Sequence, residues 1–461
     1  MRGLGHPAGF LLAIGLLLIP ISAMALVGAG SEREWTVMVY MNAKNNLEPY
    51  ALKNFHSMAE VGSTAKVSIV AQLGRPAGRH YTKPETSKES EWSGVYRFLI
   101  GKDTKPVPEH AVVEVKAIGE SEDMGAPAAL EQFIVWSRQN YPAKRYMLVI
   151  WNHGQGWRLL MTSKDGGQGL SPESAPLHPL SGGGETSSPA IGGFRAISVD
   201  DDTGHILYNR EVQEVIAGQF RGVKLDVLGY DACLMAMIET AYGLTESVTV
   251  MIGSEELEPG MGWRYATWLD KVIAKPTLAA EDLGLAVVES YRSEYGDELL
   301  TTLSALRLSE IRSLAKQLSS FADALRSAGE IELRVMRSAR ANVRAYGESA
   351  KPPAPYSVDL SALLREYESR TSNVNLRSQA ANVRSAISKA VISNYASERS
   401  RYPNGKKPYG SEGVAIYYPE TANTFRKDFF HRGYLKDNIE KPVDFVRMES
   451  WADLLYKLLG I

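Results

Sequence analysis

One histidine and one cysteine follow two apolar segments that are typical of buried β-strands. His153 comes two residues after the apolar run 146–151, and Cys233 comes three residues after the run 223–230. Parallel strands of an open α/β sheet end at one edge, where such folds bind ligands. If the two strands are neighbours, the imidazole and the thiol converge. Imidazole can accept the thiol proton and later protonate a leaving amine, so the two residues can act as a base and a nucleophile.

The residues around this pair suit the same chemistry. Gly154 leaves the backbone beside His153 open to close approach, and its N–H and that of Cys233 could face the oxyanion of a tetrahedral intermediate. A helix is expected from about Cys233 through Met235 to Tyr242. Its macrodipole would favour a thiolate at its start.

The elements that must position these residues alternate between strand and helix patterns. After the strand-like run 35–41, an apolar helix face starts at Leu47, and Asn45 or Asn46 can cap that helix. Further strand-like runs cover 67–73, 95–100, 146–151, 223–230 and 248–254. Several are apolar on both faces, which predicts an α/β fold with a mostly parallel sheet sandwiched by helices. We expect a catalytic domain over 33–305 and a C-terminal α+β subdomain over 306–461, packed on the first.

Two short segments resemble the signature motifs of the clostripain family of cysteine peptidases. They are Trp-Asn-His-Gly-Gln-Gly-Trp at 151–157 and Gly-Tyr-Asp-Ala-Cys-Leu-Met-Ala at 229–236. The likeness extends to 35–41, 254–263 and 416–419. These peptidases are relatives of caspases, legumain and gingipains. The resemblance implies a caspase-like fold, with His153 as the catalytic histidine and Cys233 as the nucleophile.

The resemblance also implies that Asp231 lies in the pocket for the substrate residue that precedes the scissile bond. A carboxylate there would favour Arg or Lys by charge-assisted hydrogen bonding. The alternative is that Asp231 hydrogen-bonds its own turn, as Asp often does after a strand. Some relatives are expected to carry a second acidic group in the loop after the next strand. That loop has Met261 here, with Glu255, Glu256 and Glu258 nearby.

The N-terminus has the pattern of a secretory signal peptide. Arg2 precedes an apolar run over 10–21, and Ala23-Met24-Ala25 has the small-x-small form of a cleavage site. We therefore expect residues 1–25 to be removed and the protein to be exported to the periplasm or beyond. The alternative is an uncleaved segment that anchors the protein in the membrane.

The charge composition by itself indicates no partner. Lys plus Arg number 51 and Asp plus Glu number 53, so there is no electrostatic sign of nucleic-acid binding. The resemblance implies protein or peptide substrates with basic residues, and we expect no membrane contact once the signal is cleaved. The oligomeric state stays open. Cys233 is the single cysteine of the sequence, so no disulfide forms within the chain.

A Gly- and Ser-rich segment over 156–195 separates the two motifs and indicates an exposed loop. An enzyme that prefers basic residues would cut itself in such a loop, and the candidate sites are Lys164 and Arg195, with Lys164 preferred. The resemblance also implies maturation by internal cleavage. The alternative is a simple insertion.

Cofactor motifs are missing from the sequence. No HExxH motif or clustered histidines indicate a zinc site, and Asp200 to Gly204 fails the spacing of an EF-hand, so we interpret it as an acidic turn. No cofactor is required, although the resemblance leaves calcium possible at an unknown site. The alternative function is a catalytically silent binding or scaffold protein with the same fold. The presence of His153, Cys233 and Asp231 together argues against it.

Overall fold

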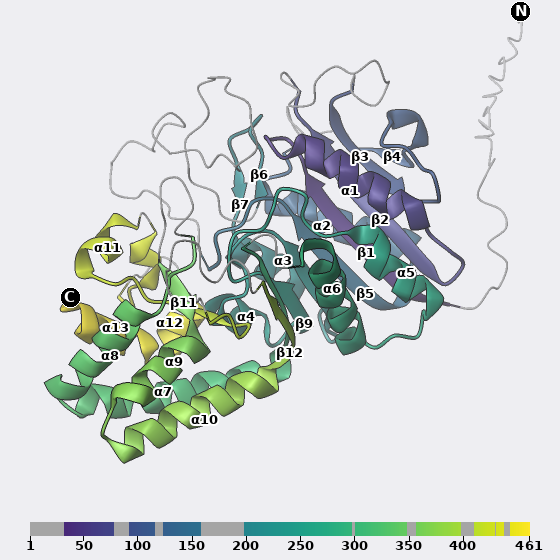
Figure 1. Ribbon diagram of the computed structural model, residues 1–461. Helices are drawn as coiled ribbons and strands as arrows, with labels where there is room; N and C mark the ends of the chain where they lie inside the picture. The colour runs from purple at the N-terminus through teal and green to yellow at the C-terminus, as the bar shows by residue number, and fades with distance from the viewer. Residues whose placement is uncertain are drawn as a thin grey trace, which may run out of the picture.

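The computed structural model describes residues 32–77, 92–115, 123–157, 198–296, 300–347, 356–397, 410–428, 430–437 and 443–461 (Figure 1). The expected signal peptide at 1–25 lies outside the described residues, as do Lys164 and Arg195. Within the described ranges, no helix combines the length and the apolar character that crossing a membrane would need.

A nine-stranded sheet forms the centre of the described structure, in the order β12-β10-β9-β8-β5-β1-β2-β3-β4. The five central strands from β9 to β2 are parallel, whereas the strands added at both edges are antiparallel. The strands are β1 (Arg33–Asn42), β2 (Val67–Arg75), β3 (Gly94–Leu99), β4 (Val113–Glu114), β5 (Ala143–Trp151), β8 (Leu225–Asp231), β9 (Val248–Gly253), β10 (Thr302–Arg307) and β12 (Val391–Ala396). A separate pair, β6 (Ser198–Val199) and β7 (Ile206–Leu207), is antiparallel.

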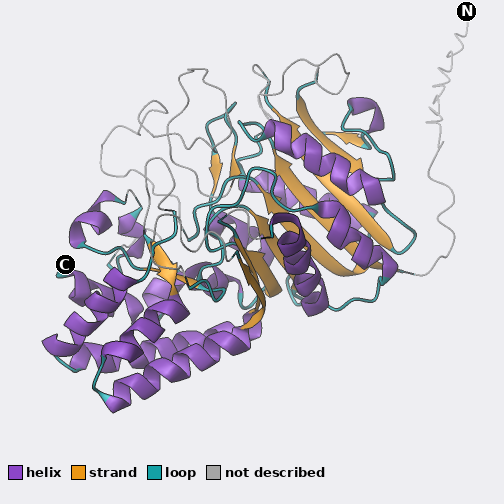
Figure 2. Ribbon diagram, in the orientation of Figure 1, coloured by secondary structure: helices purple, strands orange, loops and turns teal. Residues whose placement is uncertain are grey.

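Helices cover both faces of this sheet, because alternate side chains of the central strands are apolar on both sides. In β1, Met38 and Tyr40 belong to one buried core, whereas Val37 and Val39 belong to another. The second core is closed by α1 (Glu48–Val61), α5 (Tyr265–Ala274) and α6 (Ala280–Tyr295), which lie in front of the sheet in Figure 2. The first core is closed by α2 (Pro127–Asn140), α3 (Asn209–Gln219) and α4 (Ile238–Leu244). The predicted α/β sandwich is confirmed.

The C-terminal part extends the first core and also completes the sheet. Its helices are α7 (Ile311–Ser327), α8 (Glu330–Asn342), α9 (Leu360–Arg370), α10 (Val374–Ala390), α11 (Ala422–Lys427), α12 (Asp444–Met448) and α13 (Trp451–Leu459). A small antiparallel pair joins β11 (Ser357–Asp359) to β13 (Ala415–Tyr417). Strand β12 returns to pair with β10, which itself crosses the expected boundary at 305. The division into two domains there stays a prediction.

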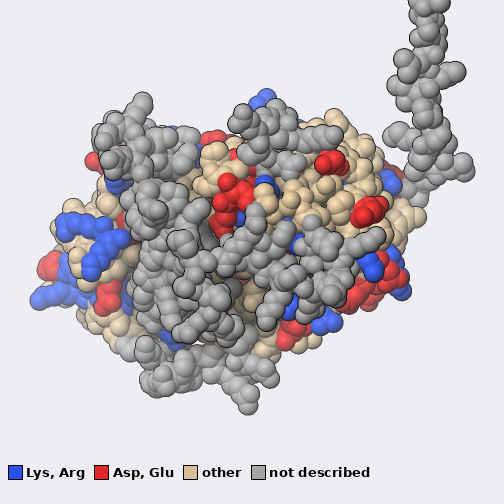
Figure 3. All heavy atoms as spheres, turned by 90° about the horizontal axis from the view of Figure 1, so that it is seen from above, with Lys and Arg blue, Asp and Glu red and all other residues tan. Residues whose placement is uncertain are grey.

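Charged side chains of both signs are spread over the surface seen from above in Figure 3. Basic side chains gather at the side of the molecule where α11 and α13 lie, and acidic side chains gather nearer the middle.

A buried glutamate links the C-terminal part to α4. Glu239 is 1% exposed, and its Oε1 accepts hydrogen bonds from the Tyr417 backbone N–H and the Tyr434 hydroxyl, both at 2.9 Å. Burial raises the pKa of Glu239 from 4.5 to about 7. The folded protein therefore binds this proton more tightly than the unfolded chain. The resulting stabilisation is complete below about pH 4.5 and is lost as the pH rises toward 7.

We expect Glu239→Gln to stabilise the protein at pH 8 by up to about 3 kcal/mol and to change little at pH 5. Gln keeps an acceptor for both hydrogen bonds but never ionises. Thermal unfolding at the two pH values measures the effect, with Glu246→Gln as the control because the Glu246 side chain is 84% exposed. An equal effect at both pH values would contradict this role.

Candidate active site

The loops that carry His153 and Cys233 leave the sheet side by side. Strands β5 and β8 are parallel neighbours, and Trp151 at the end of β5 pairs with Asp231 at the end of β8. The Asn152 backbone N–H continues this pairing by donating to the Asp231 carbonyl at 3.3 Å. Both candidate residues thus follow the carboxyl ends of adjacent strands, which is the arrangement that convergence of imidazole and thiol requires.

Close contact between the two loops depends on Gly154. A Cβ atom built on this glycine would lie 2.2 Å from the Cys233 carbonyl oxygen and 2.9 Å from the Cys233 nitrogen. Any larger residue would push the loops apart, since real Cβ atoms do not approach backbone so closely. The backbone after His153 therefore packs directly against the backbone of the candidate nucleophile.

Asparagine side chains orient His153. Its Nε2 lies 2.9 Å from Asn46 Oδ1, and its backbone N–H donates to Asn152 Oδ1 at 2.6 Å. An amide oxygen can only accept, so Nε2 of a neutral ring carries the hydrogen and Nδ1 keeps the lone pair that can accept a proton. This tautomer is assigned from the hydrogen bond. Asn46 is thus a site residue that the sequence motifs did not identify.

The expectation that Asn45 or Asn46 caps the first helix is wrong. Helix α1 begins at Glu48 after Leu47, with no side-chain cap. Asn45 accepts from the Leu47 backbone N–H at 2.9 Å and donates to the Val199 carbonyl at 2.9 Å. The two asparagines therefore hold together the loops at the end of the sheet. The two asparagines lie near His153 because β1 pairs with β5, and no local sequence pattern predicts this pairing.

Cys233 lies in a turn rather than at the start of a helix, so the expected macrodipole assistance is wrong. Helix α4 begins only at Ile238. The next residue, Leu234, has a φ of 63°, a left-handed conformation that non-glycine residues rarely adopt. The hydrogen bond from the Leu234 N–H to the Glu256 carbonyl, at 3.1 Å, holds this turn. Such a strained residue beside a reactive group is typical of a functional turn.

The thiol of Cys233 is enclosed, although the residue as a whole is partly exposed. Its Sγ accepts a hydrogen bond from the Glu258 backbone N–H at 3.2 Å. Burial raises the pKa of the thiol to about 12, and the nearby Glu258 and Glu256 carboxyl groups act in the same direction. The thiol is therefore protonated at neutral pH in this structure. A base would have to remove this proton before the thiol could act as a nucleophile.

Asp231 is buried beneath the same edge, with 4% of its surface exposed. Its Oδ2 accepts from the Tyr265 hydroxyl at 2.9 Å and from the Trp263 backbone N–H at 3.2 Å. These donors come from α5 and from the segment before it, and not from the turn that follows Asp231. Burial raises the pKa of Asp231 to about 7.

A lysine from the segment after β1 contacts the acidic turn at 200–204. Lys44 Nζ lies 3.4 Å from carboxylate oxygens of both Asp200 and Asp202, and Lys44 and Asp200 are buried. A calcium ion in this turn would face the buried ammonium group of Lys44, so the turn does not fit calcium. Over the described ranges, no group of three or more His, Cys, Asp or Glu side chains is arranged to hold a metal ion.

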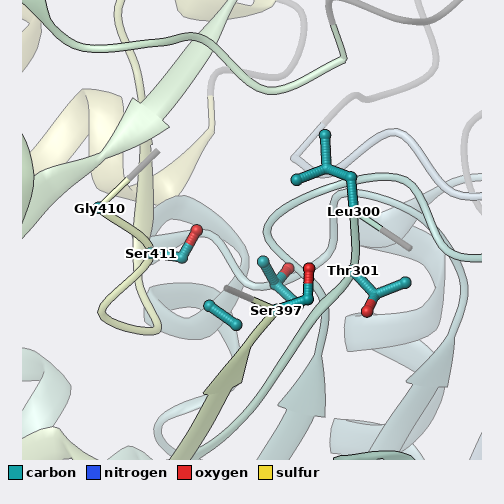
Figure 4. Close-up of a pocket in the computed structure, with 7 residues that line it drawn as sticks. Leu300, Thr301, Ser397, Gly410 and Ser411 are labelled. Carbon is teal, nitrogen blue, oxygen red and sulfur yellow. The ribbon is translucent and has the colours of Figure 1, made fainter. Parts of the chain in front are cut away.

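A small pocket lies apart from His153 and Cys233, between the start of β10, the end of β12 and residues 410–411 (Figure 4). The hydroxyl of Thr302, one of its lining residues, bonds Ser254 Oγ at 2.8 Å and accepts from the Glu255 N–H at 3.0 Å. Its other lining residues are Leu300, Thr301, Ala396, Ser397, Gly410 and Ser411. The pocket wall therefore supports the segment after β9, but it offers no nucleophile and base of its own.

A histidine and a cysteine at adjacent strand ends of a helix-covered sheet fit a thiol hydrolase with an α/β sandwich fold. A model of the clostripain family matches residues 39–165 and 184–456, so the chain belongs to that family. The predicted membership is confirmed. The chain is 25% identical to clostripain from Hathewaya histolytica over 254 residues, which are 52% of this chain and 42% of that protein. The chain thus matches less than half the length of that relative.

Two solved structures have the same fold. A secreted C11 cysteine protease from Bacteroides thetaiotaomicron, in complex with an irreversible peptide inhibitor, superposes with a TM-score of 0.56. Its sequence identity is 17%, over 91% of this chain and 98% of that one. An inactive zymogen C11 protease from Parabacteroides distasonis gives a TM-score of 0.53 and 17% identity, over 84% and 92% of the two chains.

We expect Cys233→Ala and His153→Ala each to lower peptide cleavage by about three orders of magnitude or more, since neither partner works alone. Both variants should keep the circular dichroism spectrum and melting temperature of the parent to within a few degrees. Cleavage assays on purified variants measure the loss. Full activity in Cys233→Ala would overturn the assignment of the nucleophile.

Proposed function

We propose that the protein is an exported cysteine endopeptidase that cleaves peptide bonds after Arg or Lys. The observation that carries this proposal is the packing of Gly154 against the Cys233 backbone, which brings the His153 and Cys233 loops together. Membership of the clostripain family supports the same activity. The buried carboxyl group of Asp231, two residues before the nucleophile, supports the preference for a basic residue.

The proposed reaction uses only groups of this chain and water. His153 Nδ1 removes the proton from the Cys233 thiol, and Sγ attacks the carbonyl carbon of the scissile bond. The N–H groups of Gly154 and Cys233 stabilise the oxyanion that forms. The imidazolium then donates its proton to the leaving amine as the C–N bond breaks, which leaves a thioester on Cys233. Water, deprotonated by His153, hydrolyses this thioester and regenerates the thiol.

A catalytically silent protein with this fold is the alternative, and a thiol reagent distinguishes the two. A chloromethyl ketone that carries Lys or Arg should alkylate Cys233 in the native protein, because a catalytic thiol becomes reactive only when the site positions the reagent. A silent protein would react no faster with this reagent than with iodoacetamide. Mass spectrometry of the labelled protein identifies the modified residue.

Export is supported by the apolar N-terminal pattern and by the Bacteroides thetaiotaomicron relative, which is a secreted protease. Mature protein that begins after Ala25 would establish cleavage of the signal. Retention of residues 1–25 would instead favour the membrane anchor.

Asp231→Asn should weaken cleavage after Arg and Lys by about ten- to a hundredfold, because it removes a charge from a desolvated site and keeps the shape. The measurement is kcat/KM on matched fluorogenic peptides with Arg, Lys or Ala before the cleaved bond. Unchanged cleavage after Arg in the variant would show that Asp231 does not bind the substrate cation.

Self-processing between the two motifs is part of the proposed maturation, and the inactive zymogen from Parabacteroides distasonis, with the same fold, fits such a step. We expect a two-chain active form cut after Lys164, and a single chain in Cys233→Ala. N-terminal sequencing of the active protein locates the cut. Lys164→Ala, with Arg195→Ala as the matched variant, then tests which site is used. A fully active chain that stays uncut would rule out processing as a requirement.

A further inference from the structure

Two buried carboxyl groups join the segment 254–258, which follows β9, to the C-terminal part of the chain. Glu255 is 1% exposed and Asp359 is fully buried, and the proposed reaction uses neither. The two side chains are in hydrogen-bonding contact. Since a carboxylate only accepts hydrogen bonds, two carboxyl groups bond each other only when one of them carries a proton. The pair therefore holds a proton in the folded protein.

The surroundings of the pair place this proton on Glu255. Asp359 is the N-cap of α9, where its Oδ1 accepts from the Ala362 N–H and its Oδ2 accepts from the Glu412 N–H at 2.7 Å. The dipole of a helix favours a negative charge at this end. Glu255 Oε2 accepts from the Gly413 N–H at 3.0 Å, which leaves Oε1 to carry the proton. Asp359 is thus the ionised member of the pair, and Glu255 is the donor.

The ionisation of the pair agrees with this assignment. Burial raises the pKa of Asp359 to about 6, while the hydrogen bond from Glu255 and the charge of Arg365 limit the rise. Burial, together with the charge of Asp359, raises the pKa of Glu255 well above its usual range. Over the described ranges, the other charged and titratable groups around the pair are Glu256, Tyr346, Arg365 and Glu412.

The segment that contains Glu255 also holds the turn of the candidate nucleophile. The Glu256 carbonyl accepts from the Leu234 N–H at 3.1 Å, and the Glu258 N–H donates to Cys233 Sγ at 3.2 Å. Both contacts are made by the backbone, so they move whenever the segment moves. The side chain of Glu255 bonds in the opposite direction, to the C-terminal part of the chain. The segment is thus held between the Cys233 turn and the C-terminal elements.

We propose that Glu255 is a positioning residue for the nucleophile, because the hydrogen bond that it donates to Asp359 holds the segment 254–258 against the turn of Cys233. The inference rests on the proposed function and deepens it, since it names a residue that sets the position of the attacking thiol. Ionisation of Glu255 would place two negative charges side by side in a buried site, and the segment would separate from α9.

The first test compares two substitutions of Glu255. Glu255→Gln keeps the shape of the acid, and its amide can donate to Asp359 and accept from the Gly413 N–H, so we expect kcat within about twofold of the parent. Glu255→Leu has a similar volume but makes neither hydrogen bond. We expect its kcat to fall about tenfold or more, because a small displacement of the thiol is enough to slow the attack. Its KM should stay within about threefold of the parent.

The matched control is Glu420→Gln, which changes an exposed carboxyl group in the same part of the chain. Its kcat and KM should both stay within about twofold of the parent values. Circular dichroism and thermal unfolding of each variant show that the compared enzymes are folded.

The outcomes separate this inference from the proposed function. If the parent protein does not cleave peptides, the proposed function is wrong. If the parent cleaves them and folded Glu255→Leu keeps the parent kcat, the proposed function stands and the positioning role is overturned. An equal loss of kcat in Glu255→Gln and Glu255→Leu would also overturn that role, because Gln restores the hydrogen bonds.

Infrared spectroscopy detects the proton directly and does not require cleavage. A protonated carboxyl group has a C=O stretching band apart from those of carboxylates and amides. At about pH 7.5, the spectrum of the parent minus that of Glu255→Gln should contain such a band, with the intensity of about one carboxyl group. The same difference with Glu420→Gln should lack it. No band in the first difference spectrum would overturn the proton on Glu255, and it would do so even if Glu255→Leu failed to fold.

Discussion

The pairing of β5 with β8 is the constraint on which the site depends. It places the residues after Trp151 and Asp231 at the same level of the sheet, so the two loops have no room to separate. Gly154 then lies against the backbone of Cys233 at a distance that a side chain would prevent. Backbone packing therefore sets how closely the loops of the two candidate catalytic residues approach each other. Strand pairing in a parallel sheet is buried on both faces, which makes this level of the structure hard to deform.

The same arrangement explains why the Cys233 thiol is protonated in this structure. Because no helix begins at Cys233 and the Glu258 segment covers the thiol, burial dominates its ionisation. A protonated thiol is protected from oxidation, since the thiolate is the reactive species. The hydrogen bond to Asn46 fixes the tautomer of His153, the candidate base for this thiol.

The sequence predicted the sheet, the order of its central strands along the chain, and the two strand ends that carry His153 and Cys233. These features could be predicted because buried parallel strands are apolar on both faces and therefore stand out in the sequence as short apolar runs. It did not predict the partners of the site. Asn46 was not assigned to the site, because it reaches His153 through the pairing of β1 with β5. Glu258 was noted as a nearby acidic residue, but its contact with Cys233 depends on the pairing of β8 with β9. The helix expected at Cys233 failed for a local reason, since the left-handed Leu234 and the bond to Glu256 hold a turn there.

The segment after β9 connects this site to the C-terminal part of the chain. Glu255 accepts from the Gly413 N–H at 3.0 Å, and its carboxyl group also lies beside Asp359 at the start of α9. Glu256 accepts from the Gly347 N–H at 2.9 Å. The carboxyl groups of Glu255 and Glu256 thus contact the C-terminal elements, whereas the backbone N–H of Glu258 donates to Cys233 Sγ. Since buried polar contacts fix geometry more sharply than apolar packing does, the C-terminal part sets the position of the segment that covers Cys233. The C-terminal part thus helps to shape the candidate active site, although it contains neither His153 nor Cys233.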